Sequence, residues 1–188
     1  MNGRGLFKLI KYPLNLIVCI LRLIPNFLLV LVYDFLTMVP TKIGVLLRYV
    51  VVKSMSRNIG DNVYIGRYVI LKNIKKLHIG NNVSIHEFCY IDAVGGITIG
   101  DNVSIAHNSS IISFEHTWSD TSVPIKYNKI IAKPIIIEDD VWIGCGVRIL
   151  SGSYVSKRSI LAAGTVFKLS GEKNSIYVGM PSKKKKEI

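Results

Sequence analysis

Branched hydrophobic residues recur every six positions over most of the C-terminal two thirds of the chain. The blocks IGDNVYIG from Ile59, IGNNVSIH from Ile79 and IGDNVSIA from Ile99 begin 20 residues apart, and IEDDVWIG from Ile137 is related to them. Further steps of six residues follow the last block, at Ile149, Val155, Leu161 and Phe167. A fixed phase of six predicts a solenoid with three short faces per coil, each turning one branched side chain inward. An antiparallel sandwich would not need that phase.

Turn residues support the same fold. Gly, Asp and Asn follow the inward positions, and they tolerate positive φ where β-branched residues do not. The third face is longer by two residues in the first coils, since Leu71 to Ile79 and Ile91 to Ile99 are each eight residues apart. We therefore predict an all-β parallel β-helix over residues 53–170. An excursion at residues 113–134 interrupts it.

The N-terminal segment, residues 1–52, is dense in Leu, Ile and Val, and prolines and single charges interrupt it. A transmembrane helix needs about 20 apolar residues, whereas the uncharged stretches at 12–21 and 23–33 are shorter. Joined across Arg22, the two stretches could span a bilayer as one helix, because a single arginine adds only a few kcal/mol to the free energy of membrane insertion. A pair of helices hinged near Pro25 and lying in the headgroup plane fits the charges better. The alternative is a helical cap buried against the β-helix or a neighbouring subunit.

Composition adds to this picture. The net charge is +12, with 49% hydrophobic and only 19% charged residues, so anionic partners and some lipid contact are favoured. No aromatic and basic module for stacking bases is visible, so we expect no nucleic-acid partner. The cysteines Cys19, Cys89 and Cys145 lack metal or redox spacing and are interpreted as reduced thiols. With no convincing cleavable signal, we expect a cytoplasmic catalytic portion at the inner face of the cytoplasmic membrane.

Five segments carry a resemblance to a known family. They are IAHNSSIISFEHTW from Ile105, the loop from Ser119 to Pro134, PIIIEDDVWIGCGVRILSG from Pro134, AAGTV from Ala162 and SIYVGMPSK from Ser175. In order and spacing the chain resembles the hexapeptide-repeat acyltransferases, within them the maltose, nodulation-factor, O-antigen and capsule O-acetyltransferase branch. The resemblance implies a left-handed coil, a homotrimer, acetyl-coenzyme A in a groove between adjacent β-helices, and a sugar acceptor nearby.

His116 occupies the place of the family's loop histidine, which implies the role of general base toward an acceptor hydroxyl. An imidazole ordinarily titrates near neutral pH and suits that role. The residue also opens the excursion five positions after Ile111, and insertions in a regular solenoid usually serve binding. Glu115 beside it could orient the imidazole or the acceptor, or could be an exposed loop carboxylate.

The resemblance also implies a coenzyme site. It places Trp142 beside the pantetheine arm and lets backbone groups near Gly144, Cys145 and Ala163 pair with its amides. Small residues suit a thin ligand there. Lys168 and Lys183 could meet the coenzyme's phosphates as point charges. The run Lys184 to Lys186, in the C-terminal extension at 171–188, is interpreted as solvated or lipid-facing.

Two further residues are candidates for the acceptor pocket. His86 stands on a corner where parallel repeats carry Gly or Ala, and Asp92 follows the inward Ile91. Asp92 could hold sugar hydroxyls or serve a β-turn. The γ-type carbonic anhydrases share this fold, but His86 and His107 fall at different points of the repeat, so we expect no metal site.

The combined expectation is an O-acetyltransferase that acts on a sugar hydroxyl of a cell-envelope saccharide, such as a capsule, O-antigen or exopolysaccharide. A lipid-linked saccharide acceptor is suggested by the apolar N-terminus. N-acylation of an amino sugar and a non-catalytic trimeric scaffold are the alternatives.

Overall fold

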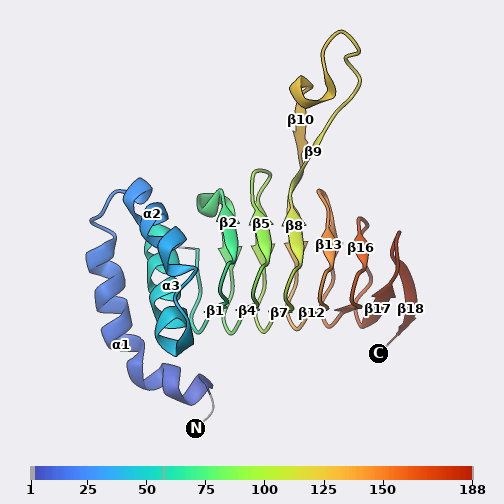
Figure 1. The fold of residues 1–188 in the computed structure, drawn as a ribbon. Coiled ribbons are helices and arrows are strands. Elements are labelled where there is room, and N and C mark those ends of the chain that lie inside the picture. The colour runs from blue at the N-terminus through green and yellow to red at the C-terminus, as the bar shows by residue number, and fades with distance from the viewer. Residues whose placement is uncertain (1–2, 57, 188) are drawn as a thin grey trace.

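A stack of short parallel strands follows three N-terminal helices in the computed structural model, which describes residues 3–56 and 58–187 (Figure 1). The helices are α1 (Gly3–Leu21), α2 (Asn26–Leu36) and α3 (Thr41–Met55). We call this helical part the cap. The predicted hinge near Pro25 lies between α1 and α2. Residues 1 and 2 of the predicted 1–52 segment lie outside the described residues.

Three sheets form the faces of the coil. Face 1 contains β3 (Leu77–Ile79), β6 (Ile97–Ile99), β11 (Ile135–Ile137) and β14 (Tyr154–Val155). Face 2 contains β1 (Tyr64–Ile65), β4 (Ser84–Ile85), β7 (Ser104–Ile105), β12 (Trp142–Ile143), β15 (Ile160–Leu161), β17 (Ser175–Val178) and β18 (Lys183–Glu187). Face 3 contains β2 (Ile70–Lys72), β5 (Tyr90–Asp92), β8 (Ser110–Ile112), β13 (Arg148–Ile149) and β16 (Val166–Phe167). Corner 1 joins faces 1 and 2, corner 2 joins faces 2 and 3, and corner 3 leads to the next coil.

The six-residue phase is confirmed by the strand register. On face 2, each inward residue pairs with its counterpart one coil away, in the column Ile65, Ile85, Ile105, Ile143, Leu161 and Tyr177. Equivalent columns run through Ile59 to Val155 on face 1 and through Leu71 to Phe167 on face 3. Nearly all these side chains are fully buried, so the stacked columns form the core. The left-handed sense of the coil stays a prediction.

The backbone conformation at the corners explains why polar residues and glycines recur in the repeat. Positive φ falls on Asn62, Asn82 and Asn102 at corner 1, as predicted for turn asparagines. The same expectation is wrong for Gly60 and Gly80, whose φ is not positive. A Cβ on Gly60 would lie 2.4 Å from the carbonyl oxygen of Gly80, so these glycines serve the close approach of neighbouring coils.

The two extra residues of the first coils lie at corner 3, as expected. There the short 3₁₀ helix η1 (Ile74–Lys76) separates β2 from β3. Because corner 3 absorbs the insertion, Leu77, Ile97 and Ile135 stay in register on face 1.

The cap closes the N-terminal end of the coil. Helices α1 and α2 both pack on α3, and α3 packs on the first coil (Figure 1). The buried Arg48 donates hydrogen bonds to the carbonyl oxygens of Leu36 (2.9 Å) and Ile65 (2.9 Å), which ties α2 to β1. The hydroxyl of Tyr33 donates to the carbonyl oxygen of Val69 (2.8 Å). The inner side of the helical segment thus packs on the β-helix, which is the arrangement that the alternative interpretation describes.

At the other end, the strand stack continues beyond residue 170, where we predicted its end. β17 pairs in parallel with β15, and β18 returns antiparallel to β17. The basic run Lys184 to Lys186 is thus part of an edge strand, and the Lys184 ammonium lies 2.6 Å from the Glu172 carboxylate. Lysines on an edge strand discourage further strand pairing. Residue 188 lies outside the described residues.

Among the described residues, no helix combines the length and the hydropathy that a membrane crossing requires.

Candidate active site

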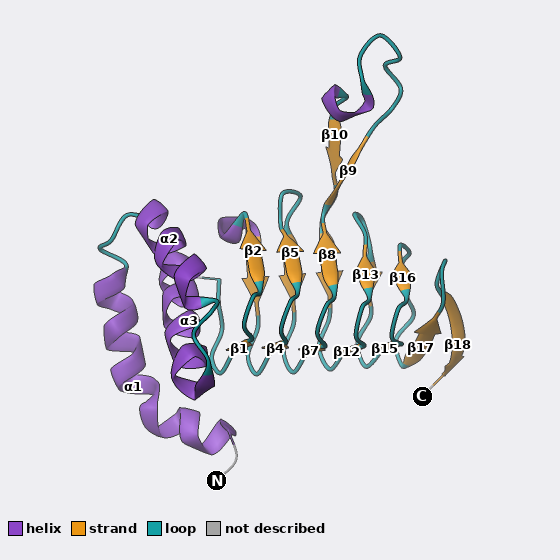
Figure 2. Cartoon of the chain, viewed as in Figure 1, coloured by secondary structure: helices purple, strands orange, loops and turns teal. Residues whose placement is uncertain are grey.

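The predicted excursion is an arm, residues 113–134, that stands out from corner 3 (Figure 2). Its base is an antiparallel pair of strands, β9 (Phe114–His116) and β10 (Ile130–Ala132). Its tip contains the 3₁₀ helix η2 (Ile125–Tyr127). The Asn128 side chain holds the tip together: its amide donates to the carbonyl oxygen of Asp120 (3.0 Å), and its oxygen accepts from the Asp120 amide (3.0 Å).

His116 lies on the arm and is exposed, with its backbone opposite Ile130. Its ring packs edge-on against Phe114, with 6.3 Å between ring centroids. No described residue forms a hydrogen bond to the imidazole. A hollow of about 380 Å³ beside it is lined by Glu115, His116, Thr117, Trp118, Ser119 and Ile131.

Glu115 does not approach the imidazole of His116. Its two carboxylate oxygens accept hydrogen bonds from the Lys168 ammonium at 2.6 and 2.8 Å. Neighbouring residues of a strand point to opposite faces, so Glu115 and His116 diverge. Lys168 follows β16 at corner 3, and this ion pair therefore joins the base of the arm to a later coil.

Asp92 lies at the same corner as the arm, one coil earlier, in register with Ile112. Its carboxylate is almost fully buried and accepts hydrogen bonds from the Asn73 amide (2.7 Å) and the Tyr90 hydroxyl (3.3 Å). These bonds fix its orientation. Its role toward a sugar stays a prediction.

Trp142 lies on face 2, in register with Ser104 and Ile160. The side chain is 51% exposed and contributes nothing to the inward columns. It borders a hollow of about 290 Å³ whose other walls include Arg158 and Asp140. A large aromatic face beside a surface hollow suits a thin, partly apolar ligand.

Gly144, Cys145 and Ala163 gather at corner 2, next to Trp142. A Cβ on Gly144 would lie 2.7 Å from the Ala163 nitrogen, so glycine is required there by the stacking of coils. The Gly144 amide already donates to the Leu161 carbonyl oxygen (2.8 Å), and the Cys145 carbonyl oxygen accepts from the Gly164 amide (2.9 Å). Ala163 is exposed. The small residues thus leave corner 2 without bulky side chains. An extended coenzyme would need such a surface to lie against the backbone.

The remaining candidates lie apart from His116. Lys183 is exposed at the start of β18, the last strand of face 2. His86 is at corner 2, two coils before Gly144, where its ring packs on Tyr64 and its Nδ1 lies 3.8 Å from a Glu87 oxygen. The structure therefore does not bring His86 to the arm.

Within the described ranges, no three His, Cys, Asp or Glu side chains are close enough to hold a metal ion. Burial raises the pKa of the Cys89 thiol, which keeps it protonated and poorly nucleophilic.

The candidate residues thus form two groups at two corners of the coil. His116, Glu115, Asp92 and Lys168 belong to corner 3, whereas Trp142, Gly144, Cys145 and Ala163 belong to face 2 and corner 2. Face 3 separates the groups in one chain.

Sequence reasoning missed two features of the site. The first is the Glu115–Lys168 ion pair, although counting hexads places residue 168 on the same corner as residue 112. The second is Trp118, which lines the hollow with His116; an aromatic residue two positions after the histidine was the available signal.

No protein-family model matches the chain. The sequence is 36% identical over 73 residues to a Mycobacterium tuberculosis protein named probable acetyltransferase Rv3034c. The matched segment covers 39% of this chain and 24% of the relative. The chain thus matches about a quarter of that relative's length. A 52-residue match to the putative acetyltransferase YJL218W of Saccharomyces cerevisiae is 42% identical and covers 28% of this chain and 26% of the relative.

Solved structures match over more of the chain. A galactoside acetyltransferase in complex with coenzyme A superposes with a TM-score of 0.75 and 26% identity, covering 83% of this chain and 77% of the other. A maltose O-acetyltransferase from Clostridium difficile 630 gives 0.76 and 25%, covering 83% and 82%. AntD, an N-acyltransferase from Bacillus cereus, shares the fold with a TM-score of 0.62 and 24% identity, covering 69% and 72%. The parallel β-helix is therefore shared with solved acyltransferases, among them a galactoside acetyltransferase that binds coenzyme A and a maltose O-acetyltransferase.

Proposed function

We propose that this protein transfers the acetyl group of acetyl-coenzyme A to a hydroxyl group of a sugar, with His116 as general base. The observation that carries the proposal is the arm, which breaks the coil to place an exposed imidazole beside a hollow of about 380 Å³. Trp142 and the small residues of corner 2 form a second, separate feature suited to a coenzyme. A scaffold without catalytic function would need neither.

The chemistry requires one proton to move twice. A ring nitrogen of His116 takes the proton of the acceptor hydroxyl while that oxygen bonds to the thioester carbonyl carbon. As the carbon–sulfur bond breaks, the imidazolium returns the proton to the departing sulfur. Atoms balance, and no metal or redox partner is needed.

Transfer to oxygen is favoured over transfer to nitrogen. The galactoside acetyltransferase and the maltose O-acetyltransferase named above superpose with TM-scores of 0.75 and 0.76, against 0.62 for the N-acyltransferase. N-acylation of an amino sugar uses the same base and is the second candidate.

The separation of the two residue groups supports a homotrimer. If three coils pack side by side, corner 2 of one chain can face the arm of the next, which closes the distance that face 3 imposes within a chain. The resemblance to hexapeptide-repeat acyltransferases implies a coenzyme groove of this kind. For the acceptor, a lipid-linked saccharide of the cell envelope agrees with the basic, apolar cap.

The test measures coenzyme A release by the purified full chain with acetyl-coenzyme A and a panel of galactosides, maltose and amino sugars. We expect His116→Ala to lose about 100-fold or more of its turnover, which is the usual contribution of a general base. His78→Ala, a histidine exposed on face 1, is the matched control and should keep its activity. Undiminished turnover in His116→Ala would remove the proposed base, and no binding of acetyl-coenzyme A would favour the scaffold.

A further inference from the structure

The outer side of the cap is apolar as well as its inner side. On α1, Ile10, Leu14 and Val18 face α3, whereas Leu9 and Leu16 lie on the opposite, exposed side. Helices that are hydrophobic all round are normally buried on every side. Here Leu9 and Leu16 are exposed, and no element among the described residues covers them.

The same surface continues along the chain. Leu23, in the turn between α1 and α2, is 85% exposed, and on α2 Phe27 and Phe35 are 67% and 70% exposed. Only Leu29 and Tyr33 of α2 are buried. Because α1 packs on α3, and α2 packs on α3 and also contacts the first coil, these side chains share the cap end of the molecule (Figure 1). We call this surface the outer face of the cap. A large amount of exposed apolar surface at one end of a molecule usually marks an interaction site.

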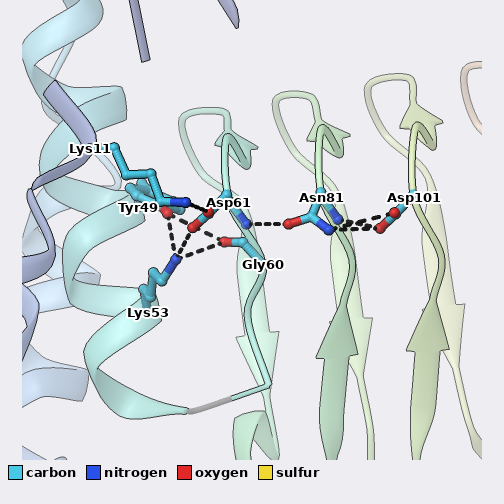
Figure 3. Close-up of polar contacts among 7 residues, drawn as sticks. All are labelled: Lys11, Tyr49, Lys53, Gly60, Asp61, Asn81 and Asp101. Atoms are coloured by element: carbon cyan, nitrogen blue, oxygen red, sulfur yellow. Dashed lines mark hydrogen bonds and ion pairs between the residues drawn. The ribbon is translucent and has the colours of Figure 1, made fainter. Parts of the chain in front are cut away.

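A polar ladder fixes the direction in which α1 presents that face (Figure 3). At corner 1, the amide of Asp61 donates to the Asn81 side chain (2.9 Å), and the amide of Asn81 donates to Asp101 (2.6 Å). Each side chain thus accepts a hydrogen bond from the coil before it.

Asp61 belongs to the first coil, so no earlier coil uses its carboxylate. The cap takes that place. Lys11 of α1 lies 2.6 Å from one Asp61 oxygen, and Lys53 of α3 contacts the other. With Lys11 drawn toward the coil, the apolar residues at the opposite side of α1 point outward.

The positive charge of the cap distinguishes between a second copy of the chain and a lipid bilayer as the partner of the outer face. Residues 1–56 contain seven Lys and Arg but a single acidic residue, Asp34. Arg48 is buried, and Lys11 and Lys53 pair with Asp61, so the other four basic residues set the charge that the cap offers a partner. Arg22 and Lys42 are both exposed beside the apolar surface. Two copies of this cap would bring together surfaces of the same sign, whereas an anionic bilayer offers lipid tails and negative headgroups together.

We infer that the outer face of the cap docks onto the surface of an anionic lipid bilayer, with α1 and α2 lying in the headgroup plane. The described helices are not suited to crossing it, which agrees with a peripheral arrangement. This inference does not rest on the proposed function, since it concerns a different end of the molecule.

The test is co-sedimentation of the full chain with vesicles of phosphatidylcholine alone or of equal parts of phosphatidylcholine and phosphatidylglycerol. We expect binding to the anionic vesicles, weakened but not abolished by high salt because apolar burial is not screened. The double variant Leu23→Asp/Phe27→Asp should bind about tenfold more weakly or worse. An aspartate at position 27 suits the first turn of α2, so the helix is preserved.

The matched control is Phe88→Asp/Ile125→Asp, which adds the same charge at exposed apolar positions on the coil and the arm. Its vesicle binding should stay within about twofold of the parent's. Equal loss in both variants, or no binding of the parent to either vesicle, would overturn the inference. A change of oligomeric state in Leu23→Asp/Phe27→Asp alone would assign the outer face to a second copy instead.

A second measurement leaves the outer face intact. Cys19 is exposed on α1, Cys89 is buried, and Cys145 can be replaced by serine, so a fluorophore can be attached at Cys19 alone. Its emission should shift to the blue on addition of anionic vesicles. An unchanged spectrum with sedimenting protein would show that another surface binds.

Discussion

The carboxylate of Glu115 binds Lys168, and it forms no hydrogen bond to the His116 imidazole one position later. Both side chains of the ion pair are substantially exposed, and such pairs typically contribute less than about 1 kcal/mol to folding. The value of this pair lies in position: it ties the base of the arm, and with it His116, to a later coil. Small displacements of a catalytic group can cost large factors in rate.

The pairing leads to a prediction that separates the two roles considered for Lys168. If it positions the arm, then Lys168→Gln, Glu115→Gln and the double variant should each lower kcat by about tenfold, with the KM for acetyl-coenzyme A unchanged. The double variant should be no worse than either single one, because both remove the same contact. Steady-state kinetics with varied acetyl-coenzyme A measures this.

Lys183→Gln is the control for that experiment. Lys183 lies at the start of β18, away from the arm, and its expected partner is a coenzyme phosphate. It should raise the KM for acetyl-coenzyme A and leave kcat unchanged. A raised KM in Lys168→Gln with normal kinetics in Glu115→Gln would instead return Lys168 to the phosphate site.

The contacts of single side chains were the feature of this protein that the sequence predicted least well. His116 became a candidate through the family resemblance and because it opens a break in the repeat, whereas Trp142 became one through the resemblance. The partner of Glu115 is 53 positions away, and a repeat phase gives the corner but not the direction of a side chain on an arm that has left the repeat.

The inward columns determine the stability of the coil. Ile105 is fully buried between Ile85 and Ile143, so its truncation leaves a cavity that the stacked strands cannot easily close. We expect Ile105→Ala to lower the free energy of unfolding by about 2–5 kcal/mol. Ile70→Ala, at an exposed position of β2, should cost less than about 1 kcal/mol. Denaturant titration of both variants gives the comparison, and similar losses would contradict the column as the core.

Asp61 gives the attachment of the cap a dependence on pH. Partial burial raises the pKa of this carboxyl group, but hydrogen bonds and charge from Lys11 and Lys53 outweigh it and leave the pKa below its ordinary value. Because the pKa is lower in the folded state, the stabilisation is complete at neutral pH. It is lost as the pH falls below about 4, through the lowered pKa.

Asp61→Asn should therefore be less stable than the parent at pH 7, by about 1 kcal/mol given the partial exposure of the site. The difference should shrink as the pH falls through the acidic range. Free energies of unfolding between neutral and acidic pH test this, with Asp34→Asn, an exposed residue of the same cap, as the control. A difference that does not vary with pH would contradict the ion-pair account.

Elements were more predictable than residue partners. Hexad spacing gave the strands, the lengthened corner 3 and the limits of the arm, because each coil must bury one branched side chain per face. The cap was less determined, since its Leu-rich pattern fits packing on protein and on lipid equally well. Only the placement of Arg48, Tyr33 and Lys11 shows which sides of the helices meet the coil. The strand stack continues past residue 170 because Tyr177 follows Phe167 by ten residues and so departs from the six-residue phase on which the prediction rested.

At the level of the whole molecule, the division of the candidate site between two corners is the feature with the widest consequence. In one chain, His116 extends from corner 3 while Ala163 and its neighbours occupy corner 2. Closed threefold symmetry would repeat the same contact three times, each uniting the arm of one chain with corner 2 of the next. Each site would then belong to two chains.

Such a site can be restored from two inactive variants. His116→Ala lacks the base, and Ala163→Trp fills the exposed corner where the coenzyme is expected, so neither should be active alone. When equal amounts are unfolded and refolded together, random assembly into trimers pairs an intact arm with an intact corner at about a quarter of the interfaces. Activity should therefore recover to about a quarter of the parent's. Mixing the two after separate folding should restore nothing, since subunits that have already assembled keep their partners. If the co-refolded sample stays inactive although each variant folds and forms trimers, then both halves of the site come from one chain, and the arm must fold back across face 3 to complete it.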